Sequence, residues 1–463
     1  MATVPMQIRR ARGYLDIARS DSLTRNSLYM MASTVVTAGL GYIFWIVTAH
    51  VFTSAQVGIG SAVISLCSTV ALLTYLGSWA TLIERLHAYE RSRKWTAVVV
   101  RMCVITAALT AVAAAAAVPL LAHAKGYGSF FSAAPMVVMA VVGSAAWTLV
   151  NLFSAAFIAA RRADGLLSIQ TLVSVVKVLL VVPIAIAGRS AGEIVGAWVG
   201  SALLGVAIGA VWLLPRLGLG HRPLGSISHR SLRAGVLAAD QPGGTLRRPA
   251  SRARHRQRLR PDASSVGRLV GQHLTSVGGA ATPLVLPVVV VLRLGVTPSA
   301  YFYITWMIGG VFFMVSPSVS AALFAETVRA GSDLSTVVGR AFRVICCLLI
   351  PAMAVMIAAG RFILGIFGHP YASAGYGLLI LLAISALPDA VSNVAVAVFR
   401  VTKRLNYSAS LNLGIMIATI VGAWFLMPPL GILGAGVAWL SAQLLGAIAS
   451  IPAYAHLHRG LTA

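Results

Sequence analysis

Two charged side chains lie inside long apolar stretches of this sequence. Lys177 falls within 165–187 and Asp389 within 372–399. A charge at the centre of a bilayer-spanning helix costs about 2.5–3.5 kcal/mol on insertion scales, so both residues are candidates for function. The compact ammonium of Lys177 suits phosphate oxygens, and the carboxyl of Asp389 suits a cation or a proton. The structural alternative is that each charge only holds helices together.

The depths of these two residues are similar. At 1.5 Å per residue, Lys177 lies about 18 Å and Asp389 about 15 Å from the same end of their helices. This match permits either a salt bridge between Lys177 and Asp389 or a shared aqueous cavity.

Further candidates lie near the ends of apolar stretches. Arg101, His273 and Arg293 are possible substrate contacts, although an arginine at a helix end is often only an interfacial anchor. Glu84 and Glu326 end two corresponding stretches and are candidates for a latch, or are simply solvated helix-end charges.

Three prolines interrupt two of the apolar stretches. Proline removes a backbone hydrogen bond from a helix interior, so Pro283, Pro287 and Pro317 predict kinks that serve either gating or packing.

These residues belong to a chain with the composition of a polytopic membrane protein. Hydrophobic residues make up 58% of the 463, charged residues only 10%, and the mean hydropathy is +0.87. About 20 apolar residues cross the hydrocarbon core as a helix. The apolar runs are continuous rather than alternating, which favours helices over a barrel. We expect an all-α protein with about twelve crossings, namely 27–52, 57–83, 95–122, 133–160, 165–187, 192–215, 268–292, 298–325, 338–358, 372–399, 407–428 and 430–455.

The basic residues predict the orientation of these crossings. Of the 36 Lys and Arg residues, all but five gather on alternate connections and both termini; the exceptions are Lys125, Arg189, Arg293, Arg361 and the intramembrane Lys177. The positive-inside rule therefore places both termini in the cytoplasm of a multi-pass inner (plasma) membrane protein. Eight aromatic residues mostly fall within these spans, and several of them sit toward span ends, as expected for interfacial anchors: Tyr42, Trp45, Trp79, Trp95, Trp147, Trp198, Trp212 and Trp439. The formal charge of +25 is then mainly a topology signal, and we expect no nucleic-acid partner.

Two halves of the sequence resemble each other. Ile194–Ala197, Trp198 and Leu203–Gly205 in the sixth stretch recur as Ile432–Ala435, Trp439 and Leu444–Gly446 in the twelfth. Because each half has six crossings, the copies have parallel topology, which suits alternating access around a central cavity. The expected organisation is a basic cytoplasmic tail (1–26), an N-lobe (27–215), an Arg-rich disordered cytoplasmic linker (216–267), a C-lobe (268–456) and a cytoplasmic tail (457–463).

The opening unit resembles bacterial polysaccharide translocases from Asn26 through Gly41–Trp45 to Gln56–Ala62, and so does Pro283–Pro287 with Gly295 and Tyr301–Tyr303. These are the lipid-linked oligosaccharide flippases of the multidrug/oligosaccharidyl-lipid/polysaccharide exporter superfamily. The resemblance implies two six-helix lobes in a V, with helices 1, 2, 7 and 8 lining the cavity. It also implies transport of a polyprenyl-diphosphate-linked saccharide from the cytoplasmic to the outer leaflet, with Lys177, Arg293, Arg101 or His273 contacting the diphosphate and Asp389 coupling an ion.

Other functions remain in competition with this interpretation. A multidrug exporter of small amphipathic cations would be favoured by aromatic and acidic cavity positions. A membrane glycosyl polymerase or ligase would need a sizeable external loop, and the longest one expected, around 359–371, has only about a dozen residues. A scaffold of a glycan-synthesis complex is a further alternative.

No enzyme motif, Walker-type phosphate loop or spaced metal-ligand set is present in the sequence. We therefore expect no catalytic activity and no cofactor. The four cysteines are expected to be small core residues. Expected partners are the lipid-linked saccharide, membrane lipids and glycosyltransferases or a polymerase of a glycan pathway.

Overall fold

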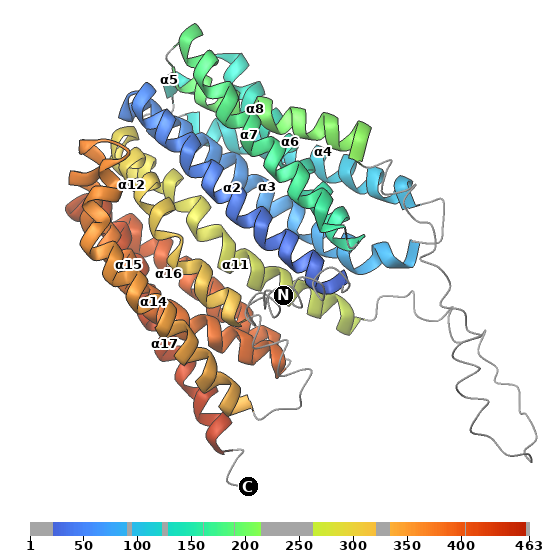
Figure 1. The fold of residues 1–463 in the computed structure, drawn as a ribbon, viewed down its shortest axis with the longest axis vertical. Helices are drawn as coiled ribbons and strands as arrows, with labels where there is room; N and C mark the ends of the chain where they lie inside the picture. The colour runs from blue at the N-terminus through green and yellow to red at the C-terminus, as the bar shows by residue number, and fades with distance from the viewer. Residues whose placement is uncertain are drawn as a thin grey trace, which may run out of the picture.

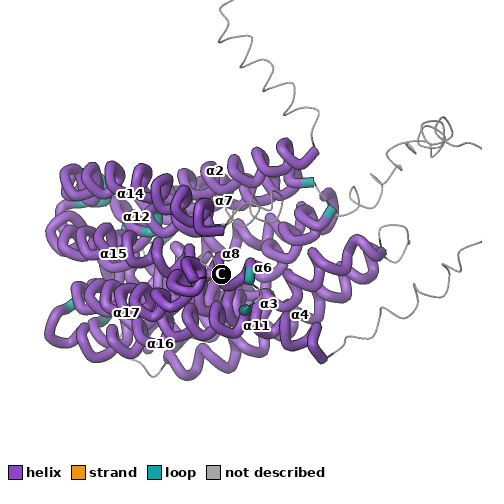
Figure 2. Tube along the Cα trace, turned by 90° about the horizontal axis from the view of Figure 1, so that it is seen from below, coloured by secondary structure: helices purple, strands orange, loops and turns teal. Residues whose placement is uncertain are grey.

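The computed structural model describes residues 22–89, 95–122, 128–160, 162–188, 190–213, 263–320, 334–402 and 404–459. Within these ranges the chain forms helices and turns but no strand, as expected for an all-α protein (Figure 2). Twelve helical segments are long and apolar enough to cross a membrane, which confirms the predicted fold class. Most of the predicted linker (216–262), most of the two tails and Glu326 lie outside the described residues. The last five residues assigned to the linker, 263–267, instead begin the seventh crossing helix, which starts at Ala263.

The first half contains six crossings. They are α2 (Ser22–Val51), α3 (Ser54–Tyr89), α4 (Trp95–Ala122), α6 (Ala134–Ala159), α7 (Ala163–Ala187) and α8 (Ala191–Ile208), with a short α5 (Gly128–Phe131) and a π-helical turn, η1 (Gly209–Leu213). The second half contains α11 (Ala263–Leu294), α12 (Val296–Gly309) continued by a helical stretch at 312–320, α14 (Leu334–Gly365), α15 (His369–Val401), α16 (Leu405–Leu430) and α17 (Ile432–Arg459).

Both halves use the same helix pairing. In the first half α2 packs on α7, α6 contacts α3, α4 and α8, and α7 packs on α8. In the second half α11 packs on α16, α15 contacts α12, α14 and α17, and α16 packs on α17. The corresponding pairs confirm the two six-helix units, which we call the N-lobe (α2–α8) and the C-lobe (α11–α17).

The two ends of the bundle differ. At the terminal end lie the described chain's start at Ser22 and its end at Arg459; we call the opposite end the far end (Figure 1). The three far-end turns of the C-lobe each contain a glycine with positive φ, namely Gly295 (92°), Gly368 (123°) and Gly431 (60°). Glycine reaches this region without the Cβ penalty of other residues, so the helices can reverse direction in very few residues.

The lobes are packed tightly at the far end and diverge toward the terminal end (Figure 1). One hydrophobic cluster joins both lobes there and includes Phe44 and Trp45 of α2 with Ile304 of α12. The rings of Trp45 and Tyr303 lie 4.7 Å apart between centroids. At Gly58 of α3 the backbone of α12 comes so close that a Cβ would lie 2.7 Å from the carbonyl carbon of Val296.

Several sequence predictions differ from the structure. Helix α14 continues to Gly365, so the connection predicted around 359–371 shortens to 366–368. Of the aromatic residues considered as interfacial anchors, Trp45 and Trp439 are buried among other helices instead. Of the four cysteines, Cys67 and Cys103 are buried, whereas Cys347 is exposed on the surface of α14.

Candidate functional site

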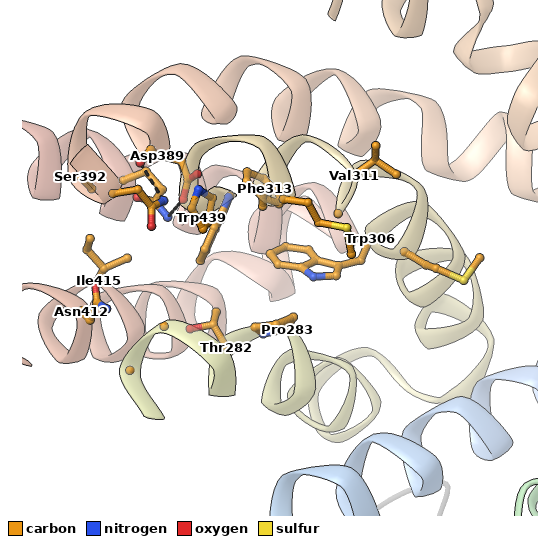
Figure 3. Close-up of a pocket in the computed structure, with 18 of the residues that line it drawn as sticks. Thr282, Pro283, Trp306, Val311, Phe313, Asp389, Ser392, Asn412, Ile415 and Trp439 are labelled. Carbon is orange, nitrogen blue, oxygen red and sulfur yellow. Dashed lines mark hydrogen bonds between the residues drawn. The ribbon is translucent and has the colours of Figure 1, made fainter. Parts of the chain in front are cut away.

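A cavity of about 440 Å³ lies inside the C-lobe, between α11, α12 with its continuation, α15, α16 and α17 (Figure 3). Helix α2 of the N-lobe closes one side through Ala38 and Tyr42. Four aromatic side chains line the cavity: Tyr42, Trp306, Phe313 and Trp439. Its polar lining comes from Thr282, Asp389, Ser392, Asn393, Asn412 and Gln443.

Asp389 is the charged residue of this cavity, and it is 6% exposed. One carboxylate oxygen accepts a hydrogen bond from the Ser316 hydroxyl at 3.3 Å, and the other accepts from Nε2 of Gln443 at 3.1 Å. Within the described residues the recorded ion pair is Arg162–Asp164, so the described part of the chain supplies no salt-bridge partner to Asp389. A buried carboxyl without a cationic partner is a natural binding group for a proton or a cation.

The wall beside this carboxyl is aromatic (Figure 3). The ring of Trp439 lies 5.3 Å from that of Trp306, at 74°, and 5.2 Å from that of Phe313, at 75°. Edge-to-face packing of this kind holds the three rings rigidly. The cavity therefore presents fixed apolar faces beside a few polar groups, which is the usual composition of a small-molecule site.

Two polar atoms of the lining have no hydrogen-bond partner among the described residues. They are Nε1 of Trp439, in a side chain that is 7% exposed, and Oε1 of Gln443, in one that is 3% exposed. Because buried polar groups are normally satisfied, an unpaired donor beside an unpaired acceptor fits a molecule that carries both kinds of group.

Backbone irregularities also face the cavity. Pro283 interrupts α11, and a proline at this position leaves the carbonyl of Gly279 without its usual intrahelical donor. Both residues line the cavity, so this interruption of the α11 hydrogen-bond pattern lies in the cavity wall.

The eighth crossing is broken beside the same cavity. The helix stops at Gly309, and the Val311 amide donates to Ile308 rather than to Met307. The carbonyl of Met307 instead accepts a hydrogen bond at 3.1 Å from the hydroxyl of Tyr42. Since Tyr42 belongs to α2, this bond links the two lobes at the point where the helix breaks.

Of the residues predicted from sequence, Asp389, Pro283 and Pro317 line the cavity. Pro287 lies further along α11, where its carbonyl accepts from the Ser299 hydroxyl at 3.3 Å. The side chain of Glu84, in α3, is not among those described.

Lys177 lies elsewhere, in the N-lobe. Its ammonium sits 4.9 Å from the ring centroid of Phe44, on the face of α7 that packs against α2. The structure therefore does not bring Lys177 and Asp389 into contact, and the matched depths do not correspond to a pair.

The remaining basic candidates also lie away from the cavity. Arg293 donates through Nε to the Trp424 carbonyl at 3.0 Å and stacks on that indole at 4.5 Å, which is the anchoring arrangement. Arg101 is exposed on α4, and His273 is half-buried near the terminal end of α11.

Trp439 and Gln443 are cavity residues that the sequence pattern alone does not identify. Gln443 carried a usable signal, because an amide within the apolar stretch 432–451 needs a partner just as a charge does.

Comparisons with known proteins support the fold. No family model and no curated protein matches this chain. Among solved structures, the inward-facing conformation of a multidrug resistance MATE family transporter of the MOP superfamily is 14% identical, with a TM-score of 0.58 over 94% of this chain and 96% of that one. The outward-facing conformation of such a transporter is also 14% identical, with a TM-score of 0.55 over 95% and 96% of the two chains. A MOP superfamily transporter from Pyrococcus furiosus, described as having a binding pocket of reverse polarity, is 14% identical, with a TM-score of 0.57 over 94% and 95%. The two-lobe, twelve-helix fold of this chain is thus that of solved transporters.

Proposed function

We propose that this chain is an alternating-access transporter that moves a lipid-linked saccharide from the cytoplasmic to the outer leaflet of the plasma membrane. The observation that carries the proposal is the C-lobe cavity, where Trp306, Trp439 and Phe313 face amide and carboxyl groups. Sugar rings have apolar C–H faces that suit aromatic walls. Their hydroxyls both donate and accept hydrogen bonds, as the unpaired atoms of Trp439 and Gln443 require.

The contacts between the lobes support a cargo with a lipid tail. Helix α3 packs along both α11 and α12, whereas α2 reaches α12 chiefly through the side chains of Tyr42 and Trp45. A seam bridged by side chains separates more readily than one packed backbone to backbone. The seam between α2 and α12 is therefore the natural path for an acyl or prenyl chain that stays in the membrane while its headgroup enters the cavity.

Asp389 is the proposed ion-coupling residue of this transporter. Its carboxyl is buried in the cavity wall and lacks a basic partner in the described chain, so a proton or metal cation has a defined place to bind. Ion binding there would compete with, or accompany, the hydrogen bonds that Ser316 and Gln443 now make to the carboxylate.

Export of an amphipathic organic cation is the second candidate. The same carboxyl lies beside a cluster of aromatic rings, and aromatic faces attract organic cations. Two of the structural neighbours are multidrug resistance transporters. Among the described residues no basic side chain lines the cavity, so this lining would not repel such a cation.

One experiment separates the two candidates. The gene is deleted in its host, and the surface glycan, the lipid-linked precursor and the accumulation of ethidium in everted vesicles are measured. The saccharide proposal expects loss of surface glycan and accumulation of precursor, both restored by the wild-type gene, with ethidium uptake unchanged. Normal glycan together with ethidium uptake that requires Asp389 would overturn it in favour of cation export.

The proposed orientation has its own test. The terminal end is placed in the cytoplasm because the basic residues gather there, which makes the present conformation open toward the cytoplasm. In intact cells, a single cysteine at position 125 should react with an impermeant thiol reagent, and one at position 162 should be protected. The reverse pattern would invert the topology.

A further inference from the structure

We infer that the C-lobe contains a second, phosphate-binding compartment at the terminal mouth of the cavity, with Arg400 as its charged residue. This inference rests on the proposed function, because it assigns a place to the phosphate group of a lipid-linked cargo. The compartment has a volume of about 530 Å³ and lies between α11, the 312–320 stretch, α15 and α16.

The two compartments adjoin. Gly279, Pro317, Asn393 and Asn412 line both of them, so an extended molecule bound in one would have its other end beside the second. Arg400 and Asp389 belong to the same helix, eleven residues apart, which corresponds to about 16 Å along α15. Arg400 lies in the last turn of α15, close to the terminal end, where lipid phosphates are expected. The aromatic compartment lies deeper.

Three features give the outer compartment the chemistry of an anion site. Arg400 lines it, and a guanidinium presents a planar set of donors that matches phosphate oxygens. Ser320, only 4% exposed, lines it as well, and its hydroxyl has no hydrogen-bond partner among the described residues. The wall is completed by Leu405, the first residue of α16, whose N-terminus has no side-chain cap.

The helix start matters because the first amide groups of an α-helix have no intrahelical acceptor and carry a partial positive charge. Phosphate groups bind at such positions when other donors converge on them. Here Arg400 and Ser320 supply those donors from two other elements. The geometry therefore assigns the outer compartment to a phosphate or diphosphate ester and the inner compartment to the sugar.

The two-compartment arrangement also explains why the described part of the chain places no basic residue in the lining of the deep cavity. The negatively charged phosphate group of the lipid-linked cargo would stay near the membrane surface, at Arg400. Only the neutral, hydroxyl-rich part of the cargo would reach Trp439 and Asp389.

Binding of farnesyl diphosphate to the purified full chain in nanodiscs of zwitterionic lipid tests this inference. We expect Arg400→Gln to weaken binding by about tenfold or more, the range expected for losing a charge-assisted hydrogen bond. Arg400→Lys should recover part of the loss, and Ser320→Ala should lower affinity less. Binding of farnesol, which lacks the diphosphate, should be the same in all variants.

Arg343 provides a matched control. It is an exposed arginine of the same lobe, in α14, but it does not line the compartment. Arg343→Gln should therefore keep the wild-type affinity to within about twofold. If Arg400→Gln also keeps it, or if Arg400→Gln weakens farnesol equally, the phosphate site is refuted.

Adding phosphatidylglycerol to the nanodiscs identifies the source of the phosphate. Competition with farnesyl diphosphate in the wild type, absent in Arg400→Gln, would assign the site to membrane headgroups; no competition would assign it to the cargo. The assay of saccharide transport tests the proposed function independently of this binding assay. Arg400-dependent diphosphate binding without glycan transport would refute the proposed function and leave the site intact.

Discussion

Replacing Gly58 by alanine should open the far end of the transporter. Gly58 lies in α3 where that helix crosses α12 of the other lobe. An added Cβ would lie 2.7 Å from the carbonyl carbon of Val296 and 3.3 Å from the amide nitrogen of Ala300, and it would be nearer still to the Val296 carbonyl oxygen. All these atoms are backbone, so no side-chain rotation can make room.

The size of the effect follows from these distances. Carbon atoms pack best at about 3.5–4.0 Å, so the two helices must separate by roughly 1 Å at this contact. Overpacking of this kind costs about 1–3 kcal/mol. The cost falls only on conformations in which the far end is closed. A difference of this size shifts the equilibrium toward far-end-open conformations by about 5- to 150-fold.

Spin labels at positions 133 and 369 measure this shift directly. Both positions are exposed at the far end, one in each lobe, and the labels can be placed after Cys346 and Cys347 are replaced by alanine. Gly58→Ala should add or enrich a longer distance in the double electron–electron resonance distribution. The control is Gly41→Ala in α2, where an added Cβ has no neighbour within 4 Å; it should leave the distribution unchanged. Identical distributions for Gly58→Ala and wild type would refute the reasoning that this contact closes the far end.

Three further substitutions test the site. Asp389→Asn keeps a similar side-chain shape beside Gln443 but removes the charge. Ion-gradient-driven transport in proteoliposomes should therefore fall about tenfold or more, while expression is retained. Gradient dependence equal to that of the wild type would exclude Asp389 from coupling. Tyr42→Phe removes the hydrogen bond to the Met307 carbonyl and should destabilise the conformation with the closed far end by about 1 kcal/mol. The same spin labels should report this as about a fivefold population shift. An unchanged population would mean that the bond does not hold the two lobes together. Lys177→Ala should leave the protein inserted and the surface glycan displayed, because Lys177 lies over Phe44 in the N-lobe and lines neither compartment; loss of glycan that Arg rescues in part and Gln does not would make Lys177 a substrate contact.

The helices could be predicted from sequence because each one is a continuous apolar run, and the bilayer fixes its length. The errors arose where one residue type has two possible environments. Arg361 was expected in a loop because it is charged, but its guanidinium lies 4.8 Å from the ring of Tyr376, and α14 continues past it to Gly365. The break after Gly309 was missed because a glycine pair within an apolar run predicts close packing as readily as a kink.

The candidate site could be predicted only in part. Asp389 was found because charge inside an apolar run is costly wherever the helix packs. Depth along a helix gives no lateral position, so the similar depths of Lys177 and Asp389 did not show that they lie in different lobes. Trp439 was misjudged because an indole suits an interface and a cavity wall equally, and only the packing on Trp306 and Phe313 distinguishes them.

The position of Asp389 also has an electrical consequence. Its cavity adjoins the Arg400 compartment toward the terminal end, while the far end is sealed by packed apolar side chains. In a transporter that is open at one end and sealed at the other, most of the transmembrane voltage falls across the sealed far end and little of it across the open terminal end. A cation binding at Asp389 from the mouth would then sense little of that voltage, but releasing it on the other side would carry its charge through most of it, worth about 2.3 kcal/mol per 100 mV. The membrane potential would therefore act on the conformational change that opens the far end, and hardly at all on the binding of the cation to Asp389.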